Sequence, residues 1–183
     1  MSELIVMLTH NDVTVPNALE VFTSCRDLPV KYWGFKDHGL EPAAMKQLVD
    51  VMKANGKTTF LEVVSYTEEE CMRGARLGVE CGFDYLLGTL YFDSVYEYVK
   101  KTDLKYCPFV GKVSQTPSIL EGTVEEMLAQ EAAFADKGIY GTDLLGYRYT
   151  GENVDEFCAD FVKGAKHPVC LAGSIGSEER IEK

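Results

Sequence analysis

Three ionisable side chains stand in a row at Lys36, Asp37 and His38, directly after the apolar run "YWGF". Such groups can belong to a solvent-exposed loop or to the rim of an active site. Successive side chains of a strand point to opposite faces, and the large residues Trp33 and Phe35 suit the face that packs on outer helices. This alternation places Lys36 on the inner face, whereas Asp37 and His38 are expected to begin the next loop and to cap the following helix.

The same alternation brings two carboxylates to the inner face. In the segments "TFLEVVS" and "GTDLLGYR", leucines that point outward place Glu62 and Asp143 inward. A lysine and a glutamate that are crowded on adjacent strands shift each other's pKa, which can provide an acid and a base near neutral pH. We therefore predict proton transfer by Lys36 and Glu62, with Asp143 as a further catalytic residue that orients the substrate; the alternative is a Lys–Glu pair that only packs.

A second chemistry is open to Lys112, in the segment "YCPFVGKV". A lysine that is buried in an apolar pocket loses proton affinity and can attack a carbonyl carbon to form a Schiff base. The alternative is a lysine that faces solvent or binds phosphate as a point charge.

The stretch "AGSIGSEERI" (172–181) indicates an anion site. Its glycines let backbone N–H groups approach an anion, and the helix predicted from about Ser177 adds the positive end of its dipole. A tight turn with a serine cap is the alternative. The residues predicted to bind phosphate or orient substrate are His10, Asn11, Arg148, Gly173, Ser174, Gly176 and Ser177.

Two kinds of segment alternate along the chain and would position these residues. Short apolar segments predict strands at 4–9, 31–36, 58–65, 83–90, 106–113, 139–148 and 168–175. Amphipathic segments predict helices at 16–26, 41–55, 67–81, 93–101, 123–137 and 152–164. Capping signals agree with these limits, since Thr67 and Thr123 each precede a glutamate by three residues and Gly82 and Gly138 follow predicted helices.

Strict alternation of strands and helices predicts a parallel sheet. An open doubly wound sheet usually carries a glycine-rich loop after its first strand, but "THNDVTVPN" contains no glycine. Polar residues instead gather at the carboxyl ends of many strands, which is typical of a (β/α)8 TIM barrel. We predict a single barrel domain over residues 1–183, truncated after strand seven, with the eighth βα unit missing from this sequence.

Composition limits the classes of protein and partner. The 183 residues are 46% hydrophobic, which indicates a globular chain, and the net charge of -11 disfavours nucleic acid and anionic membranes as partners. No apolar run is long enough to span a bilayer and no signal peptide is recognisable, so we expect a cytoplasmic protein. The six cysteines form no C-x-x-C pair. We expect reduced thiols, no metal site, no cofactor and possible homo-oligomers.

The phosphate-loop stretch "AGSIGSEERI" resembles the "GGI-x-s-x-e-d-i" element of the ribulose-phosphate-binding barrel superfamily. The segment "GTDLLGYRY" is similar to strand six of its biosynthetic isomerases, and "GFKD" to the strand-two lysine segment of N-acetylmannosamine-6-phosphate epimerases. The resemblance implies that the loop Gly173–Ser177 binds phosphate and that Lys36 is an acid/base residue. The chain departs from the isomerases at "THND", where they carry an acid or a thiol, and no single member matches.

The sequence therefore predicts an isomerase or epimerase that acts on a small phosphorylated sugar or sugar-like metabolite by acid/base proton transfer. A Schiff-base sugar-phosphate aldolase that uses Lys112 or Lys36 is the enzymatic alternative. A barrel that binds a phosphorylated metabolite without turnover, or serves as a scaffold, is a further alternative from a different class.

Overall fold

The computed structural model describes residues 2–182 and folds as two compact units. The N-terminal unit comprises the chain up to Leu86 together with Asp93–Lys105, and the C-terminal unit comprises Leu87–Phe92 together with the chain from Tyr106. The prediction of a single barrel domain stays a prediction. None of the helices in the described part of the chain is both long and apolar enough to cross a membrane.

A five-stranded sheet with the strand order β1-β4-β5-β6-β7 organises the first half of the chain. Its strands are β1 (Ile5–Met7), β4 (Tyr32–Lys36), β5 (Thr58–Val63), β6 (Tyr85–Gly88) and β7 (Lys105–Cys107). Strand β4 pairs in parallel with both β1 and β5. All five strands lie within segments that the sequence predicts as strands or one residue beyond them.

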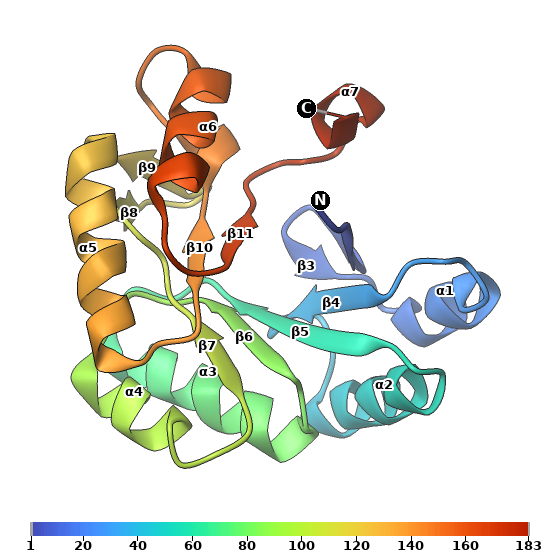
Figure 1. The fold of residues 1–183 in the computed structure, drawn as a ribbon. Coiled ribbons are helices and arrows are strands. Elements are labelled where there is room, and N and C mark those ends of the chain that lie inside the picture. The colour runs from blue at the N-terminus through green and yellow to red at the C-terminus, as the bar shows by residue number, and fades with distance from the viewer. Residues whose placement is uncertain (1, 183) are drawn as a thin grey trace. The chain divides into compact units, whose positions relative to one another are not determined.

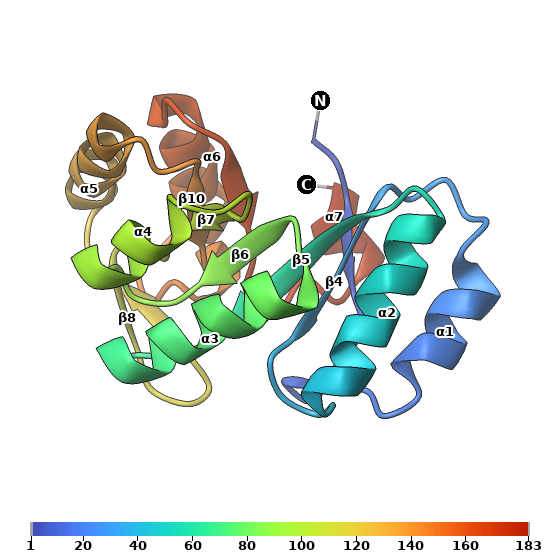
Figure 2. The same ribbon diagram turned by 90° about the horizontal axis from the view of Figure 1, so that it is seen from below.

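Helices cover one face of this sheet in the N-terminal unit, as Figures 1 and 2 show. They are α1 (Ala18–Cys25), α2 (Pro42–Ala54), α3 (Glu68–Cys81) and α4 (Asp93–Val99). The ring of Trp33 meets Phe22 of α1 edge-on at 5.1 Å, and Phe35 meets Phe83 at 4.9 Å. The contact of Trp33 with α1 agrees with the predicted alternation in β4, in which Trp33 and Phe35 share the face toward the helices, and both side chains are buried.

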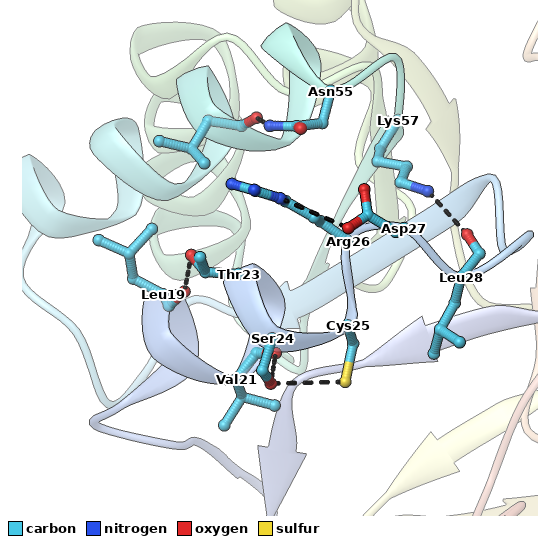
Figure 3. Close-up of polar contacts among 11 residues, drawn as sticks. Leu19, Val21, Thr23, Ser24, Cys25, Arg26, Asp27, Leu28, Asn55 and Lys57 are labelled. Carbon is cyan, nitrogen blue, oxygen red and sulfur yellow. Dashed lines mark hydrogen bonds and ion pairs between the residues drawn. The ribbon is translucent and has the colours of Figure 1, made fainter.

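The turn between α1 and β4 is held by a lysine from the start of β5 (Figure 3). Lys57 Nζ donates to the carbonyl oxygens of Leu28 at 3.0 Å and Val30 at 2.9 Å. The indole N–H of Trp33 donates to the same Val30 carbonyl at 3.1 Å. Carbonyl groups that follow the end of α1 are thereby satisfied, and the start of β4 is fixed beside β5.

The C-terminal unit contains a parallel strand pair, β10 (Thr142–Leu144) and β11 (Val169–Leu171). Two of its helices, α5 (Val124–Lys137) and α6 (Val154–Gly164), pack against each other, and every residue of the short helix α7 (Glu178–Glu182) is exposed (Figure 1). A capping box at Thr123 begins α5, and Thr67 accepts from the N–H of Glu70 at the start of α3. Both caps are as the sequence predicts.

Two antiparallel hairpins depart from the predicted alternation. One joins β2 (Thr9–His10) to β3 (Val13–Thr14), and the other joins β8 (Lys112–Ser114) to β9 (Ile119–Glu121). A 3-10 helix, η1 (Gly146–Arg148), also follows β10, where the sequence predicts continued strand. Within residues 2–182 the strands form separate sheets rather than one closed ring of eight.

Candidate functional site

Lys36 is the centre of a charged cluster at the carboxyl end of β4. It stands directly opposite Glu62 in the parallel register of β4 and β5. Its Nζ lies 3.7 Å from Glu62 Oε2 and 3.0 Å from Asp12 Oδ1. The side chains of Lys36 and Glu62 are 11% and 15% exposed, whereas that of Asp12 is 57% exposed. One ammonium group is therefore flanked by a nearly buried carboxylate and by one that is open to solvent.

Sequence reasoning missed Asp12 as a member of this cluster. Asn11 and Asp12 both adopt positive φ, at +50° and +62°, and form the two-residue turn of the hairpin β2–β3. Two central residues with positive φ are typical of a tight hairpin turn, in which Asn and Asp are favoured. The dipeptide Asn–Asp after an apolar strand was the available signal, but the sequence prediction did not place a hairpin there.

The hairpin is fastened to the backbone of Lys36. Thr14 Oγ1 donates to the carbonyl of Lys36 at 2.8 Å and accepts from the N–H of Lys36 at 2.9 Å. The N–H of Thr14 donates to the carbonyl of His38 at 2.9 Å. Gly39 has φ of +103°, and a Cβ there would lie 2.2 Å from the carbonyl oxygen of Thr14. The end of "YWGFKDHG" is thus shaped to receive this hairpin.

Burial raises the pKa of the Glu62 carboxyl above its ordinary value; the Lys36 ammonium opposes the rise, and the negative charge of Asp12 adds to it. A carboxylate with a raised pKa is a stronger base toward a carbon acid. An adjacent ammonium can stabilise an oxyanion that forms during such a transfer. The cluster therefore has the parts needed for proton abstraction beside a carbonyl group.

Asp37 follows the end of β4, and its side chain is only 6% exposed, whereas that of His38 is 60% exposed. Burial raises the pKa of the Asp37 carboxyl, and the charges of His38 and Arg73 oppose this rise. The residue that caps α2 is Glu41. The prediction that Asp37 and His38 cap this helix is therefore wrong.

His10 and Asn11 lie on the same hairpin as Asp12, and both are exposed. His10 pairs with Val13 across the hairpin. The structure thus places both predicted binding residues on the element that carries Asp12.

Lys112 is exposed, as in the solvent-facing alternative, and does not lie in an apolar pocket. Strand β7 ends at Cys107, and the exposed Lys112 begins β8 of the second hairpin. Pro108 has no N–H to continue a ladder, and Gly111 turns the chain with φ of +79°. A solvent-exposed amine lacks the desolvation that would activate it as a nucleophile.

Asp143 and Arg148 belong to the C-terminal unit. Asp143 is in β10, is 1% exposed, and its N–H donates to the carbonyl of Pro108 at 2.9 Å. Arg148 lies in η1 instead of on a strand, so its predicted strand position is wrong. Gly173 packs close to it, because a Cβ on Gly173 would lie 3.0 Å from Arg148 Cγ. The structure therefore brings Arg148 together with the predicted phosphate loop.

The loop Gly173–Ser177 is largely exposed, and Gly173 and Ser174 have positive φ of +99° and +65°. Arg180 fixes it, since Nη1 donates to the carbonyl of Ser174 at 2.6 Å and the backbone N–H donates to Ser177 Oγ at 3.3 Å. Within residues 2–182, the N–H groups of Gly173, Ser174, Gly176 and Ser177 donate no hydrogen bond. These donors are available to an anion.

Two solved structures share this fold. A glycerol uptake operon antiterminator-related protein from Thermotoga maritima superposes with a TM-score of 0.55 and 15% identity, over 99% of this chain and 88% of that one. Orotidine 5′-phosphate decarboxylase from Pyrococcus horikoshii superposes with a TM-score of 0.55 and 16% identity, over 92% and 89%. No protein-family model and no curated protein matches the chain. The similarity confirms the predicted fold class, an α/β chain of the TIM-barrel type that is not closed in residues 2–182.

Proposed function

We propose that this protein is an isomerase or epimerase that moves a proton beside the carbonyl group of a small phosphorylated sugar or sugar-like metabolite. One observation carries the proposal: the Lys36 ammonium is held between Glu62 and Asp12 at the carboxyl end of adjacent parallel strands. In barrels of this type, the carboxyl ends of the strands carry the reacting groups.

The cluster suggests a division of roles. Glu62 accepts the proton from the carbon beside the carbonyl, and the electrons of the broken C–H bond form an enediolate with negative charge on oxygen. The Lys36 ammonium, 3.7 Å from Glu62 Oε2, stabilises that oxygen or protonates it. For isomerisation, Glu62 returns its proton to the neighbouring carbon while the hydroxyl on the first carbon gives its proton to Lys36 and becomes the new carbonyl. For epimerisation, Lys36 delivers a proton to the opposite face of the same carbon and Glu62 keeps the proton that it removed.

The loop Gly173–Ser177 of the C-terminal unit is proposed, by itself, to bind a phosphate group. Its support is the set of backbone N–H donors described above and the guanidinium of Arg180 beside them. The name of one structural neighbour, orotidine 5′-phosphate decarboxylase, also describes a phosphate ester as ligand. His10 and Asn11 are proposed to orient the substrate at the Lys36 cluster, since they share the hairpin with Asp12, and Arg148 is proposed to contribute to the phosphate loop beside it.

The Schiff-base alternative is weaker in this structure. Lys112 is exposed, and the amine of Lys36 is engaged by carboxylates at 3.0 and 3.7 Å. An amine that is held by two carboxylates is not free to approach a carbonyl carbon. Binding without turnover remains the rival from a different class, and one structural neighbour is named as antiterminator-related.

Proton exchange in heavy water tests the proposal. The protein is incubated in D2O with a panel of ketose phosphates, aldose phosphates and orotidine 5′-phosphate, and loss of the proton beside the carbonyl is followed by NMR. We expect exchange with at least one sugar phosphate, strongly reduced in Lys36→Met and retained in Lys46→Met, whose exposed lysine pairs with Asp50 on α2.

Each rival gives a different result in the same experiment. Reduction by borohydride to a stable adduct would favour the aldolase, and release of carbon dioxide would favour a decarboxylase. A thermal shift with sugar phosphates but no exchange would support a binding protein and overturn the catalytic proposal.

A further inference from the structure

We propose that Thr14 is the positioning residue for Lys36, and that the hairpin β2–β3 sets the place of the ammonium relative to Glu62. The inference rests on the proposed function for its catalytic meaning. Independently of that function, one hairpin contacts both ends of Lys36. Thr14 binds the backbone of Lys36, and Asp12 binds its ammonium.

The hydroxyl of Thr14 makes an unusual pair of contacts. It donates to the Lys36 carbonyl at 2.8 Å and accepts from the Lys36 N–H at 2.9 Å, so both backbone polar groups of one residue depend on one side chain. Thr14 is 1% exposed, and water cannot replace the hydroxyl readily at such a site. Loss of the hydroxyl would leave both backbone groups of Lys36 without this partner.

The same hairpin holds the other end of the lysine. Asp12, two residues before Thr14, lies 3.0 Å from Lys36 Nζ. The two-residue turn and the close approach of Gly39 to the Thr14 carbonyl fix the hairpin on the end of β4. A shift of the hairpin would therefore move the backbone and the ammonium of Lys36 together, relative to Glu62 on β5.

The test compares Thr14→Val, which keeps the shape and removes the hydroxyl, with Thr14→Ser, which keeps the hydroxyl. Thr102→Val is the matched control, because Thr102 Oγ1 also donates to a carbonyl, that of Val99 at 2.7 Å, and accepts from an N–H, that of Leu104 at 3.2 Å. The first readout needs no substrate: acetylation of Lys36 by sulfo-NHS acetate, measured by peptide mass spectrometry relative to the exposed Lys46.

We expect acetylation of Lys36 to rise severalfold in Thr14→Val and to stay at the wild-type level in Thr14→Ser and Thr102→Val. Exchange in D2O should fall by about tenfold to a hundredfold in Thr14→Val, because a displacement near 1 Å costs a rate of that order. Thr14→Ser should restore the rate. Thr14→Ala serves as the second hydroxyl-free variant if Thr14→Val does not fold.

Equal acetylation of Lys36 in the wild type and in the folded hydroxyl-free variant would overturn the positioning role. An equal rise in Thr102→Val would also overturn it, because general loosening would then explain the effect. If no sugar phosphate exchanges in the wild type, the proposed function fails while the acetylation result still decides the role of Thr14.

Discussion

Two buried glutamates, one in each unit, show how surroundings separate structural from chemical carboxylates. Glu131 on α5 is 1% exposed, and its Oε1 accepts from the backbone N–H groups of Lys166 at 3.2 Å and His167 at 3.0 Å. It also lies 3.0 Å from Nδ1 of His167. Glu62 is 15% exposed and faces the ammonium of Lys36 at 3.7 Å.

The difference lies in what each carboxylate contacts. Backbone N–H groups are fixed in place, so the hydrogen bonds to Glu131 stabilise the turn before β11. A lysine ammonium sits on a flexible stem and can exchange a carboxylate for a developing oxyanion. Burial alone therefore does not mark a catalytic carboxylate, whereas a lysine ammonium beside it at the carboxyl end of a strand does.

The largest effect that tests this comparison is expected for Lys36→Met. Methionine keeps an apolar stem of similar length and removes the charged partner of Glu62. Because proton transfer by a positioned side chain contributes about 10²–10⁴-fold to rates, exchange in D2O should fall by that factor. The rate constant for proton exchange, measured with the best sugar phosphate of the panel, is the readout.

The fold of the Lys36→Met variant must be checked by circular dichroism and thermal unfolding. The corresponding variant in the C-terminal unit, Lys137→Met, removes an exposed lysine on α5 and should leave exchange unchanged. A folded Lys36→Met protein with wild-type exchange would show that the Lys36–Glu62 pair is as structural as Glu131.

The second effect concerns stability and differs in size between the two glutamates. Glu131→Ala removes the acceptor of two backbone N–H groups at a buried site, so the free energy of unfolding should fall by about 2–3 kcal/mol. Glu62→Gln should cost little at neutral pH, because it removes a charge whose burial is unfavourable. Urea denaturation at pH 7 measures both, and a larger loss for Glu62→Gln would contradict the comparison.

The pH dependence of Glu62→Gln follows from the raised pKa of Glu62. A carboxyl whose pKa is higher in the folded state binds its proton more tightly there than in the unfolded chain. Its stabilising contribution is complete below the ordinary value of 4.5 and is lost as the pH rises through the folded pKa. The stability of Glu62→Gln relative to the wild type should therefore increase as the pH rises above 4.5.

Much of the fold and half of this comparison could be predicted from the sequence. Alternating apolar residues and helix caps such as Thr67 are local signals, and they located the strands and helices to within a few residues. Lys36 and Glu62 come together because both end neighbouring parallel strands with the same side-chain parity. The order of the strands and the alternation of side chains along each strand can both be predicted from a single sequence.

The features of the fold and of the site that the sequence did not predict depend on tertiary contacts, which leave no local signal in the sequence. The hairpin β2–β3 exists because Asn11 and Asp12 both take positive φ, and its value to the site comes from Thr14, 22 residues before Lys36. Lys112 was misplaced because its apolar neighbours suggested one strand, whereas the chain leaves β7 at Pro108. The backbone partners of Glu131 lie in a turn 35 and 36 residues further along the chain.

The smallest effect, and the most specific, is a shift in the pKa of Glu62 on removal of Asp12. The negative charge of Asp12 raises this pKa and the ammonium of Lys36 lowers it. Asp12→Asn should therefore lower the pKa of Glu62. The substitution removes the negative charge of Asp12, which raises this pKa, and keeps the Lys36 ammonium, which lowers it. Lys36→Met should raise it. Carbon-13 NMR of glutamate side-chain carboxyls, assigned to Glu62 through Glu62→Gln, follows both shifts, and Asp50→Asn on the exposed face of α2 is the control that should change neither. A rise in Asp12→Asn would mean that Asp12 acts mainly by holding Lys36 close to Glu62, so that its loss separates the pair, and the three groups would then have to be treated as one coupled unit.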